Sequence, residues 1–359
     1  MLELRSTAGA FEQIEAWLRD RGFFAPGGED LVADLFLGYG LSETIRRGGS
    51  PPPPEPCQAL PLAAVSLRDT SGVRGGAWLK ECTFGPWKRS WTPAAYGSTV
   101  EQVRAAIERG DVYQVNLVQH LAAPFNGEPR ALAARLSPLV NDNRVPFEGD
   151  GWAIVSASPE LFLARRGRRV WTMPIKGTRS LDSPDDLGGS AKDAAEHVMI
   201  VDLERNDLSR VCEPGSVRWP ELMVERPLAG VRHLVSTVEG TLREGVGLAE
   251  LLAATFPGGS VTGAPKIAAV DLIAELEPVG RGASMGALGW VRGNGDLELA
   301  LTIRTFAIAA GRIHLWVGGG VVWDSDPTGE VEESVLKAAP LLEAIGAPLD
   351  APRRSAVPA

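Results

Sequence analysis

The sequence predicts an α+β fold, in which helices and strands do not alternate in a regular order. Three β-rich segments follow one another at residues 152–156, 160–165 and 169–173, with only short turns between them. Residues 286–323 show the alternation of a three-stranded antiparallel meander, with turns at 293–296 and 310–311. A doubly wound parallel sheet would need a helix after each strand, so this order of elements favours α+β.

The N-terminal third contains two predicted helices and one strand. Residues 11–21 have the apolar spacing of an amphipathic helix, and residues 48–54 form a stiff polyproline connector. A second helix is expected at 96–109, because Val100, Val103 and Ile107 share one face. The alternating residues 113–117 then predict a strand.

Four further helices are expected in the rest of the chain. A long one begins after Ser190, a suitable N-cap, and ends near Arg210. Two shorter helices at 248–254 and 266–276 flank a glycine-rich loop. The last runs from Pro327 to Ile345 and is capped by Asp326 or Thr328.

The composition argues against a membrane protein, a secreted protein and a nucleic-acid-binding protein. The 359 residues include 44% hydrophobic and 23% charged residues, and the net charge is −9. No apolar run is long enough to span a bilayer, and the N-terminus has no secretory signal pattern. No basic cluster is interleaved with aromatic residues; the densest basic run, at 165–169, is expected to be a turn between two strands. These features predict a protein without membrane or nucleic-acid partners.

Cysteine and histidine usage is informative about compartment and metals. The three scattered cysteines support neither a disulfide framework nor a zinc site, which favours a reducing cytoplasm. None of the four histidines is paired at metal-ligand spacing. A bound metal is therefore expected to be a hard cation held by carboxylates, such as Mg²⁺.

Two helices each offer a carboxylate for such a cation. Glu196 shares a helix face with apolar residues, so its charge needs a partner; a structural ion pair with Arg205 or Lys192 is the alternative. On the last helix, Glu333 flanks an apolar stripe and can pair with Lys337, a contact worth about 0.2–0.5 kcal/mol. The residues of that stripe are Val331, Val335, Ala338 and Leu342, with Glu330 beside them. The two carboxylates together suit a magnesium ion that also binds a substrate carboxylate.

Lys176 and Glu160 are candidate catalytic residues. Lys176 lies between a rigid Pro-Ile step and a Gly-Thr turn, where it is either an ordinary solvated turn residue or a nucleophile beside a bound small molecule. Glu160 lies at the start of a strand and can act as a general acid if desolvation raises its pKa.

Candidate anion-binding groups lie near the C-terminal end. Arg304 shares a strand face with Thr302 and Phe306, opposite an apolar face, and is either a carboxylate clamp or a surface arginine. Three glycines at 318–320 end a strand and leave backbone N–H groups open to an anion. The loop at 258–263 is no P-loop, because Ala264-Pro265 stands where Lys-Ser/Thr is required; it is expected to be a tight turn before the helix at Lys266.

From about Tyr96 to Ile345 the chain resembles the chorismate-utilising enzymes. This family includes anthranilate synthase component I, aminodeoxychorismate synthase component I, and the isochorismate and salicylate synthases. The matching segments are residues 110–117, 158–160, 174–178, 202–208, 233–236, 256–266, 302–305, 318–322 and 330–337. The resemblance implies the family's chorismate-binding fold, with antiparallel sheets packed together and helices on their outer faces.

Two positions discriminate among family members. Anthranilate synthases and the water-adding members usually have alanine at the position of Lys176, where aminodeoxychorismate synthases have lysine. Water-adding members place a base lysine at the position of Gln114. The combination of Lys176 and Gln114 therefore resembles aminodeoxychorismate synthase component I, which aminates chorismate on the p-aminobenzoate and folate route. Anthranilate synthase component I and a non-catalytic chorismate-binding subunit are the alternatives.

The resemblance also implies roles. Glu196 and Glu333 would bind Mg²⁺, which holds the ring carboxylate of chorismate. Lys176 would attack the ring as a covalent nucleophile, and Glu160 would protonate the leaving hydroxyl. The substrate-binding residues implied in addition are Gln114, Gly177, Thr178, His233, Arg304, Gly318, Gly319, Gly320 and Lys337.

The same resemblance suggests a division of the chain and a partner. Residues 1–95 form a shortened N-terminal region, 96–346 a catalytic domain, and 347–359 a disordered tail. There is no spare length for a glutaminase domain, and no cysteine lies in a nucleophile-elbow context. Ammonia is therefore expected from a glutamine amidotransferase subunit on a separate chain.

Overall fold

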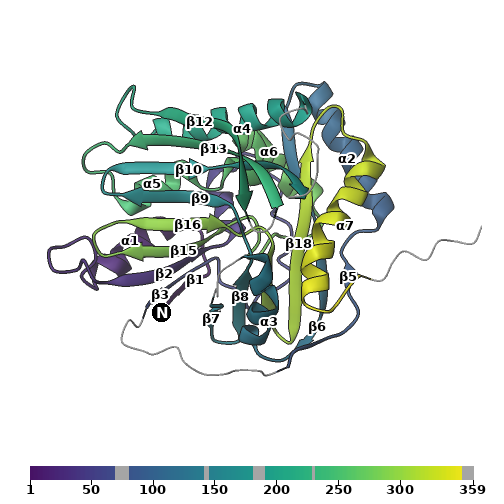
Figure 1. Ribbon diagram of the computed structural model, residues 1–359, viewed down its shortest axis with the longest axis horizontal. Helices are drawn as coiled ribbons and strands as arrows, with labels where there is room; N and C mark the ends of the chain where they lie inside the picture. Colours follow the sequence, from purple (N-terminus) through teal and green to yellow (C-terminus); the bar gives the residue numbers. More distant parts are fainter. Residues whose placement is uncertain (69–80, 141–144, 181–190, 229–230, 350–359) are drawn as a thin grey trace, which may run out of the picture.

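Two antiparallel sheets form the centre of the molecule (Figure 1). The computed structural model describes residues 1–68, 81–140, 145–180, 191–228 and 231–349. Within these ranges the large sheet has ten strands in the order β1-β3-β2-β15-β16-β9-β10-β13-β11, with β12 also paired to β13. The small sheet has eight, in the order β14-β6-β18-β17-β8-β7, with β4 and β5 also paired to β6. The predicted α+β class with antiparallel sheets is confirmed.

The strands of the large sheet are β1 (Leu2–Leu4), β2 (Val32–Leu37), β3 (Ala63–Leu67), β9 (Leu161–Arg166), β10 (Arg169–Met173), β11 (Ile175–Ser180), β12 (Arg218–Leu228), β13 (Val231–Thr241), β15 (Ala287–Arg292) and β16 (Leu297–Leu301). Those of the small sheet are β4 (Thr83–Phe84), β5 (Lys88–Arg89), β6 (Gln114–Asn126), β7 (Phe147–Gly149), β8 (Trp152–Ser156), β14 (Gly263–Ala264), β17 (Thr305–Ala309) and β18 (Arg312–Val321). The α-helices are α1 (Ala10–Arg19), α2 (Pro93–Glu108), α3 (Pro129–Leu136), α4 (Ala191–Ser209), α5 (Leu248–Thr255), α6 (Lys266–Leu276) and α7 (Pro327–Ala344). Among the described residues the 3-10 helices are η1 (Tyr39–Ile45), η2 (Ser137–Leu139) and η4 (Gly259–Val261).

The N-terminal strands extend the large sheet. Strand β2 pairs with β15 from Leu37↔Ala287 to Val32↔Arg292, and β3 and β1 follow at the edge. Ala33, Leu35 and Leu37 are fully buried, as expected for alternate residues on the inner face of a sheet. The first 67 residues therefore contribute strands and core residues to the sheet that also contains Lys176.

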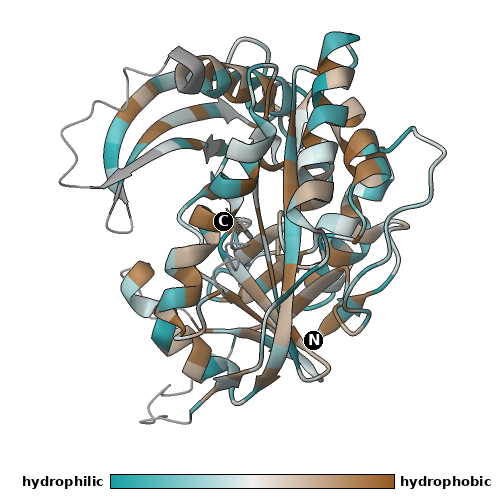
Figure 2. Ribbon diagram, turned by 90° about the vertical axis from the view of Figure 1, so that its right-hand side faces the viewer, coloured by the Kyte–Doolittle hydropathy of each residue, from teal (hydrophilic) through white to brown (hydrophobic). Residues whose placement is uncertain are grey.

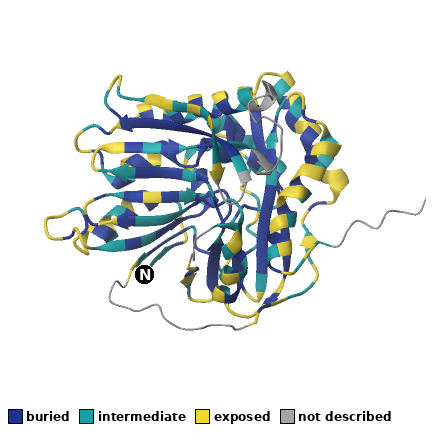
Figure 3. Ribbon diagram, viewed as in Figure 1, coloured by how far each residue is buried: buried dark blue, intermediate teal, exposed yellow. Residues whose placement is uncertain are grey.

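Helices α2 and α7 lie beside the β6–β18 pair on its outer side (Figure 1). These two strands pair over ten positions, from Arg312↔Pro124 to Val321↔Val115. Most residues of both strands are buried (Figure 3), whereas α7 has an exposed outer face. Figure 2 shows that the helices on this side have both hydrophobic and hydrophilic residues, as helices with one buried face do.

Most helices match the prediction, because amphipathic spacing is a strong signal. Thr92 caps α2 by accepting from the Ala95 N–H, and Asp326 caps α7 by accepting from the Gly329 N–H. The basic run at 165–169 does connect two strands, β9 and β10. The proposed N-cap Ser190 lies outside the described residues, as does the tail from 350 to 359. Ala347 belongs to the packed structure, since its carbonyl accepts from Trp87 Nε1 at 2.9 Å.

The predicted three-stranded meander is wrong. Residues 287–321 form four strands, of which β15 and β16 belong to the large sheet while β17 and β18 belong to the small one. The chain crosses between the sheets at residues 302–304, where Arg304 has a φ of 49°. Apolar alternation continues to Ile303, so the pattern gave no sign of this crossing.

The apolar stripe predicted for α7 is rotated about the helix. Its fully buried residues are Glu330, Ser334, Ala338, Leu341 and Leu342, whereas Val331 and Val335 are half-buried. Two polar side chains tolerate burial because each has a partner: Ser325 Oγ donates to Glu330 at 2.6 Å, and Gln119 donates to Ser334.

Candidate active site

Lys176 lies on strand β11, which pairs with β13 through Ile175↔Val235 and Lys176↔Leu234. The predicted Gly-Thr turn after it is wrong: the strand continues, with an irregular register between Lys176 and Arg179. Gly177 adopts a φ of 62°, which glycine tolerates and which allows the strand to bulge. His233 Nδ1 is 2.9 Å from the Gly177 carbonyl oxygen, so a buried ring from β13 holds the bulge. The side chain of Thr178 lies outside the described residues.

Glu196 on α4 lies next to Lys176. Lys176 Nζ is 3.7 Å from Glu196 Oε2, and the two side chains are 18% and 14% exposed. The separation is that of an ion pair too long for a direct hydrogen bond. Arg205, one alternative partner, instead pairs with Asp202 at 2.6 Å, and the side chain of Lys192 lies outside the described residues.

Glu160 is a buried carboxyl beside the same strand. Ser260 Oγ donates to its Oε1 at 2.7 Å, and the backbone N–H of Ile175 approaches the same oxygen at 3.4 Å. Burial raises the pKa of Glu160, although the hydrogen bond from Ser260 and the nearby charges of Lys176 and Arg304 oppose the rise. Glu160 thus meets the condition set for a general acid, that desolvation should raise its pKa.

Arg304 does not lie on a strand, contrary to prediction. It follows β16 and precedes β17 at the crossing between the sheets, and its φ of 49° is unusual for a residue with a side chain. Burial lowers the pKa of its guanidinium, and the charge of Glu160 opposes this. Within the described ranges its guanidinium makes no ion pair or hydrogen bond. A half-buried cation of this kind suits an anionic ligand.

The glycines at 318–320 allow close packing at the end of β18. A Cβ on Gly320 would lie 2.0 Å from Gln114 Nε2, and one on Gly318 would lie 1.9 Å from the Leu117 carbonyl oxygen. All three glycines pair with β6. A side chain at Gly318 would therefore force the two strands apart, and one at Gly320 would displace the side chain of Gln114.

Charged residues of α7 surround Gly319. A Cβ there would lie 3.1 Å from Lys337 Nζ and 3.4 Å from both Glu330 Oε2 and Glu333 Oε1. Lys337 donates to the Gly318 carbonyl at 3.0 Å and pairs with Glu333 at 2.6 Å, so the predicted i,i+4 pair is present. Glu333 is 52% exposed and accessible to a solvent cation.

Gln114 is fully buried beside Gly320, and neither its amide nitrogen nor its amide oxygen has a hydrogen-bond partner among the described residues. Such groups are rare, because an unpaired buried amide costs about 1–3 kcal/mol. A polar ligand at this position would satisfy it.

The prediction missed Ser260 and Lys266. The loop before α6 also makes contacts with the site. Ser260 donates a hydrogen bond to Glu160, and Lys266 forms a largely buried ion pair with Asp207 of α4. The sequence did indicate that a buried Glu160 would need a hydrogen-bond donor. Local sequence does not show which distant residue provides that donor. A cavity of about 10 Å³ lies next to this loop, between Thr172, Glu204 and Asp207.

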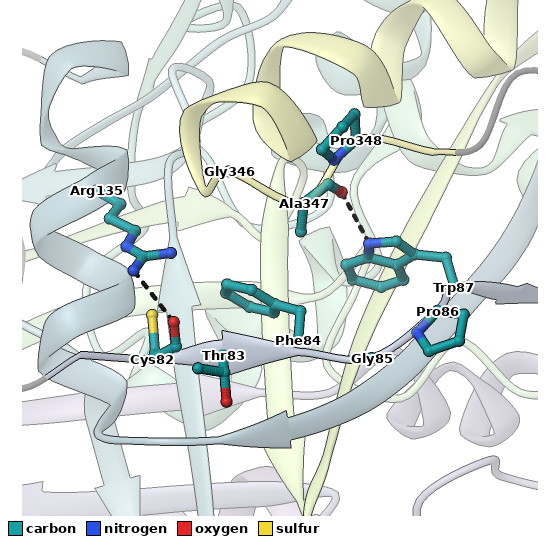
Figure 4. A pocket seen from close by; sticks show the side chains of 10 residues that line it. All are labelled: Cys82, Thr83, Phe84, Gly85, Pro86, Trp87, Arg135, Gly346, Ala347 and Pro348. Atoms are coloured by element: carbon teal, nitrogen blue, oxygen red, sulfur yellow. Dashed lines mark hydrogen bonds between the residues drawn. The ribbon is translucent and has the colours of Figure 1, made fainter.

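A larger cavity of about 420 Å³ lies elsewhere, where Phe84, Trp87 and Arg135 face the end of α7 (Figure 4). It contains none of the predicted site residues. Its polar groups are paired: Arg135 donates to the Ile345 and Cys82 carbonyls at 2.6 and 3.1 Å, and Trp87 to that of Ala347. Lys176, Glu160 and Glu196 instead lie at β11 and α4, whereas Gln114, Glu333 and Lys337 lie around the glycines of β18.

The donor set is compatible with magnesium. Glu196 and Glu333 offer carboxylate oxygens, the ligands that Mg²⁺ prefers. No three His, Cys, Asp or Glu side chains in the described part of the chain form a metal-binding group by themselves. Mg²⁺ commonly takes one or two carboxylates and completes its shell with water and substrate oxygens, so two carboxylates suffice.

Known proteins match both the sequence and the fold. Residues 80–343 match the family model described as chorismate binding enzyme. The chain is 42% identical over 263 residues to aminodeoxychorismate synthase component 1 of Klebsiella aerogenes, covering 70% of this chain and 58% of that protein. It is 38% identical over 330 residues to anthranilate synthase component 1 of Streptomyces coelicolor, covering 88% of this chain and 60% of that protein. The chain thus spans about three fifths of the length of these relatives.

The fold is that of anthranilate synthase component I from Streptococcus pneumoniae, with a TM-score of 0.75 and 28% identity over 86% of this chain and 80% of that one. Within the described ranges, every helix is too short or too polar to cross a lipid bilayer. The family model covers well over half of the sequence, and all of the predicted site residues lie within it. The chain therefore belongs to the chorismate binding enzyme family.

Proposed function

We propose that the protein aminates chorismate with ammonia to give 4-amino-4-deoxychorismate, the precursor of p-aminobenzoate. The observation that supports this most is the position of Lys176. Its side chain is largely buried and lies 3.7 Å from Glu196, and the neighbouring Ile175 contacts Glu160 through its backbone N–H. Alanine is usual at this position in anthranilate synthases. A largely buried lysine beside the substrate can serve as the nucleophile of a covalent mechanism.

Lys176 first attacks ring carbon 2. The C2–N bond forms, both ring double bonds shift by one position, and the C4–O bond breaks. Glu160 gives its proton to the departing hydroxyl, which leaves as water. Ammonia then attacks carbon 4; both ring double bonds shift back, and the C2–N bond breaks to return Lys176. The ammonium formed at carbon 4 releases a proton to solvent, and Glu160 regains one.

The other site residues bind and orient the substrate. Arg304, which has no ion pair among the described residues, suits the enolpyruvyl carboxylate as a bidentate clamp. Gln114 offers an amide without a partner to the polar ring substituents. Glu196 and Glu333 would hold Mg²⁺, which when bound neutralises the ring carboxylate. Lys337 keeps Glu333 oriented through their 2.6 Å ion pair.

The ammonia source is proposed to be a glutamine amidotransferase on a separate chain. The three cysteines of the chain are buried, so none is exposed as the nucleophile that a glutaminase needs. Free ammonium should replace the partner in vitro.

Anthranilate synthesis is the second candidate. It is favoured by the 38% identity to the Streptomyces coelicolor anthranilate synthase component 1, which extends over 88% of this chain. Lys176 opposes it, because a covalent step at carbon 2 blocks the position that anthranilate synthases aminate.

The test is incubation with chorismate, Mg²⁺ and ammonium, followed by mass identification of the product. Aminodeoxychorismate, converted by a lyase to p-aminobenzoate, supports the proposal. Fluorescent anthranilate would overturn it, and unchanged chorismate would indicate a binding subunit. Lys176→Ala is the matched variant: it should lose the product and any lysine adduct visible in the intact mass. Full activity without an adduct would refute the covalent step.

A further inference from the structure

Ser236 is a buried junction between three elements of the site. It lies on β13 and is fully buried. Its N–H donates to the Pro174 carbonyl at 3.2 Å, its Oγ accepts from the Met223 N–H at 2.9 Å, and the same Oγ is 2.6 Å from His197 Nε2. The hydroxyl therefore connects β13 to β12 and α4, while the backbone N–H of the same residue binds the segment that leads into β11.

Two of these contacts lead directly to the candidate catalytic groups. Pro174 lies two residues before Lys176 on the same extended segment, and His197 follows Glu196 on α4. The third contact satisfies a backbone group in β12, where the register shifts and Met223 adopts a φ of 52°. Without the Ser236 hydroxyl that part-buried N–H would lose its acceptor.

His197 depends on this contact for its orientation. The ring is fully buried, and its Nδ1 has no hydrogen-bond partner in the described part of the chain. The bond to Ser236 is thus the polar contact that fixes the ring, and with it the first turns of α4 against β13. The helix packs on β11, β12 and β13.

We propose that Ser236 and His197 are positioning residues that set the separation between Lys176 and Glu196. Both side chains are buried, and their contact ties α4, next to Glu196, to β13, the strand that pairs with Lys176 through Leu234; it thereby sets the 3.7 Å separation. A nucleophile and a carboxylate on different elements stay in register only if those elements are joined by groups that cannot shift. This inference rests on the proposed roles of Lys176 and Glu196.

The test uses amides that imitate one ring nitrogen each. In His197→Gln the amide reaches the place of Nε2 and can still bind Ser236, whereas in His197→Asn it reaches only that of Nδ1. Ser236→Ala removes the hydroxyl, and Ser236→Thr keeps it. The first readout is the rate at which an amine-reactive ester labels Lys176, measured by peptide mass spectrometry with exposed Lys337 as internal reference. It needs neither substrate nor Mg²⁺.

Loss of the contact in Ser236→Ala and His197→Asn should change Lys176 labelling about threefold or more and lower kcat about 10–100-fold, with KM for chorismate within about twofold. His197→Gln and Ser236→Thr should stay within about threefold of the wild type. The proposal is overturned if Lys176 labelling is unchanged in Ser236→Ala. Equal loss of melting temperature in the Gln and Asn variants, with labelling unchanged, would also overturn it. If the product is not aminodeoxychorismate, the proposed function fails, but the labelling rate still tests whether Ser236 and His197 position Lys176.

Discussion

Two buried charged clusters in this molecule differ in how completely their hydrogen bonds are satisfied. In the first, Arg281 and Glu277 are 1% and 2% exposed and share two hydrogen bonds of 2.9 and 2.8 Å. Arg281 also donates to the carbonyls of Val261 and Asn116, and Glu277 accepts from the Val118 N–H. This cluster is closed: its donors and acceptors are used within the protein.

The site cluster is open. Lys176 and Glu196 stay 3.7 Å apart, the Gln114 amide has no partner among the described residues, and burial raises the pKa of Glu160. A closed network stabilises the fold, whereas an open one costs stability and leaves groups available to a ligand. We expect this contrast to distinguish charges that stabilise the fold from charges that bind a ligand.

The largest effect is expected from Glu160→Gln. Losing the general acid should lower kcat about 1,000-fold while the melting temperature stays the same or rises, because a costly buried carboxyl is removed. Steady-state kinetics and calorimetry measure both. In the wild type the acid form is the active one, so kcat should fall as pH rises through the raised pKa of Glu160. A kcat that survives the substitution would remove Glu160 from catalysis.

Glu277→Gln should lower the stability of the fold and leave kcat unchanged. The buried guanidinium of Arg281 would keep its charge but lose its carboxylate partner. This should lower the free energy of unfolding by about 3 kcal/mol. Denaturant unfolding measures this loss, and kcat of the folded fraction should equal that of the wild type. If the variant were as stable as the parent, the distinction between closed and open clusters would fail.

Arg304→Ala should raise KM for chorismate about 30-fold, equivalent to about 2 kcal/mol, through loss of a charge-assisted contact. Arg304→Gly is the matched control, since it removes the same side chain but tolerates the φ of 49°. It should show the same KM and be about 1 kcal/mol more stable than the alanine variant. An unchanged KM in both would mean that Arg304 only shapes the crossing between the sheets.

The smallest effect is expected from Gln114→Leu. Replacing an unpaired buried amide by an apolar group of similar size should raise the unfolding free energy by about 1 kcal/mol. Chorismate binding should weaken at the same time, measured by KM or calorimetry. A loss of stability instead would show that the amide is satisfied within the fold.

Local sequence predicted those parts of the fold in which one face is apolar. It located α1, α2 and α4 to α7 and the strands β8, β9 and β10. It missed the β12–β13 hairpin, because β12 has register shifts and exposes Trp219, Leu222 and Val224 among charged residues, which obscures alternation. It also could not detect the change of sheet near Arg304, since that depends on which distant strands β16 and β17 pair with.

The site was predicted through resemblance rather than from physical pattern alone. A single carboxylate on an apolar helix face pointed to Glu196, and the structure gives it Lys176 as neighbour. Ser260 and Ser236 were not selected, because a serine acquires importance only from the group that it contacts. Both contacts are between residues far apart in the chain, so spacing does not reveal them.

The passage of the chain from one sheet to the other has a consequence for biosynthesis. When Glu160, Lys176 and Glu196 have left the ribosome, Arg304, β18 and α7 are still to be made, and β6 still lacks its long partner strand. We expect no fragment ending before residue 327 to bind chorismate, so the enzyme becomes active in a single late event. The same arrangement makes the chain suited to a split reporter: two pieces divided before β15, each inactive, would regain catalysis only on assembly.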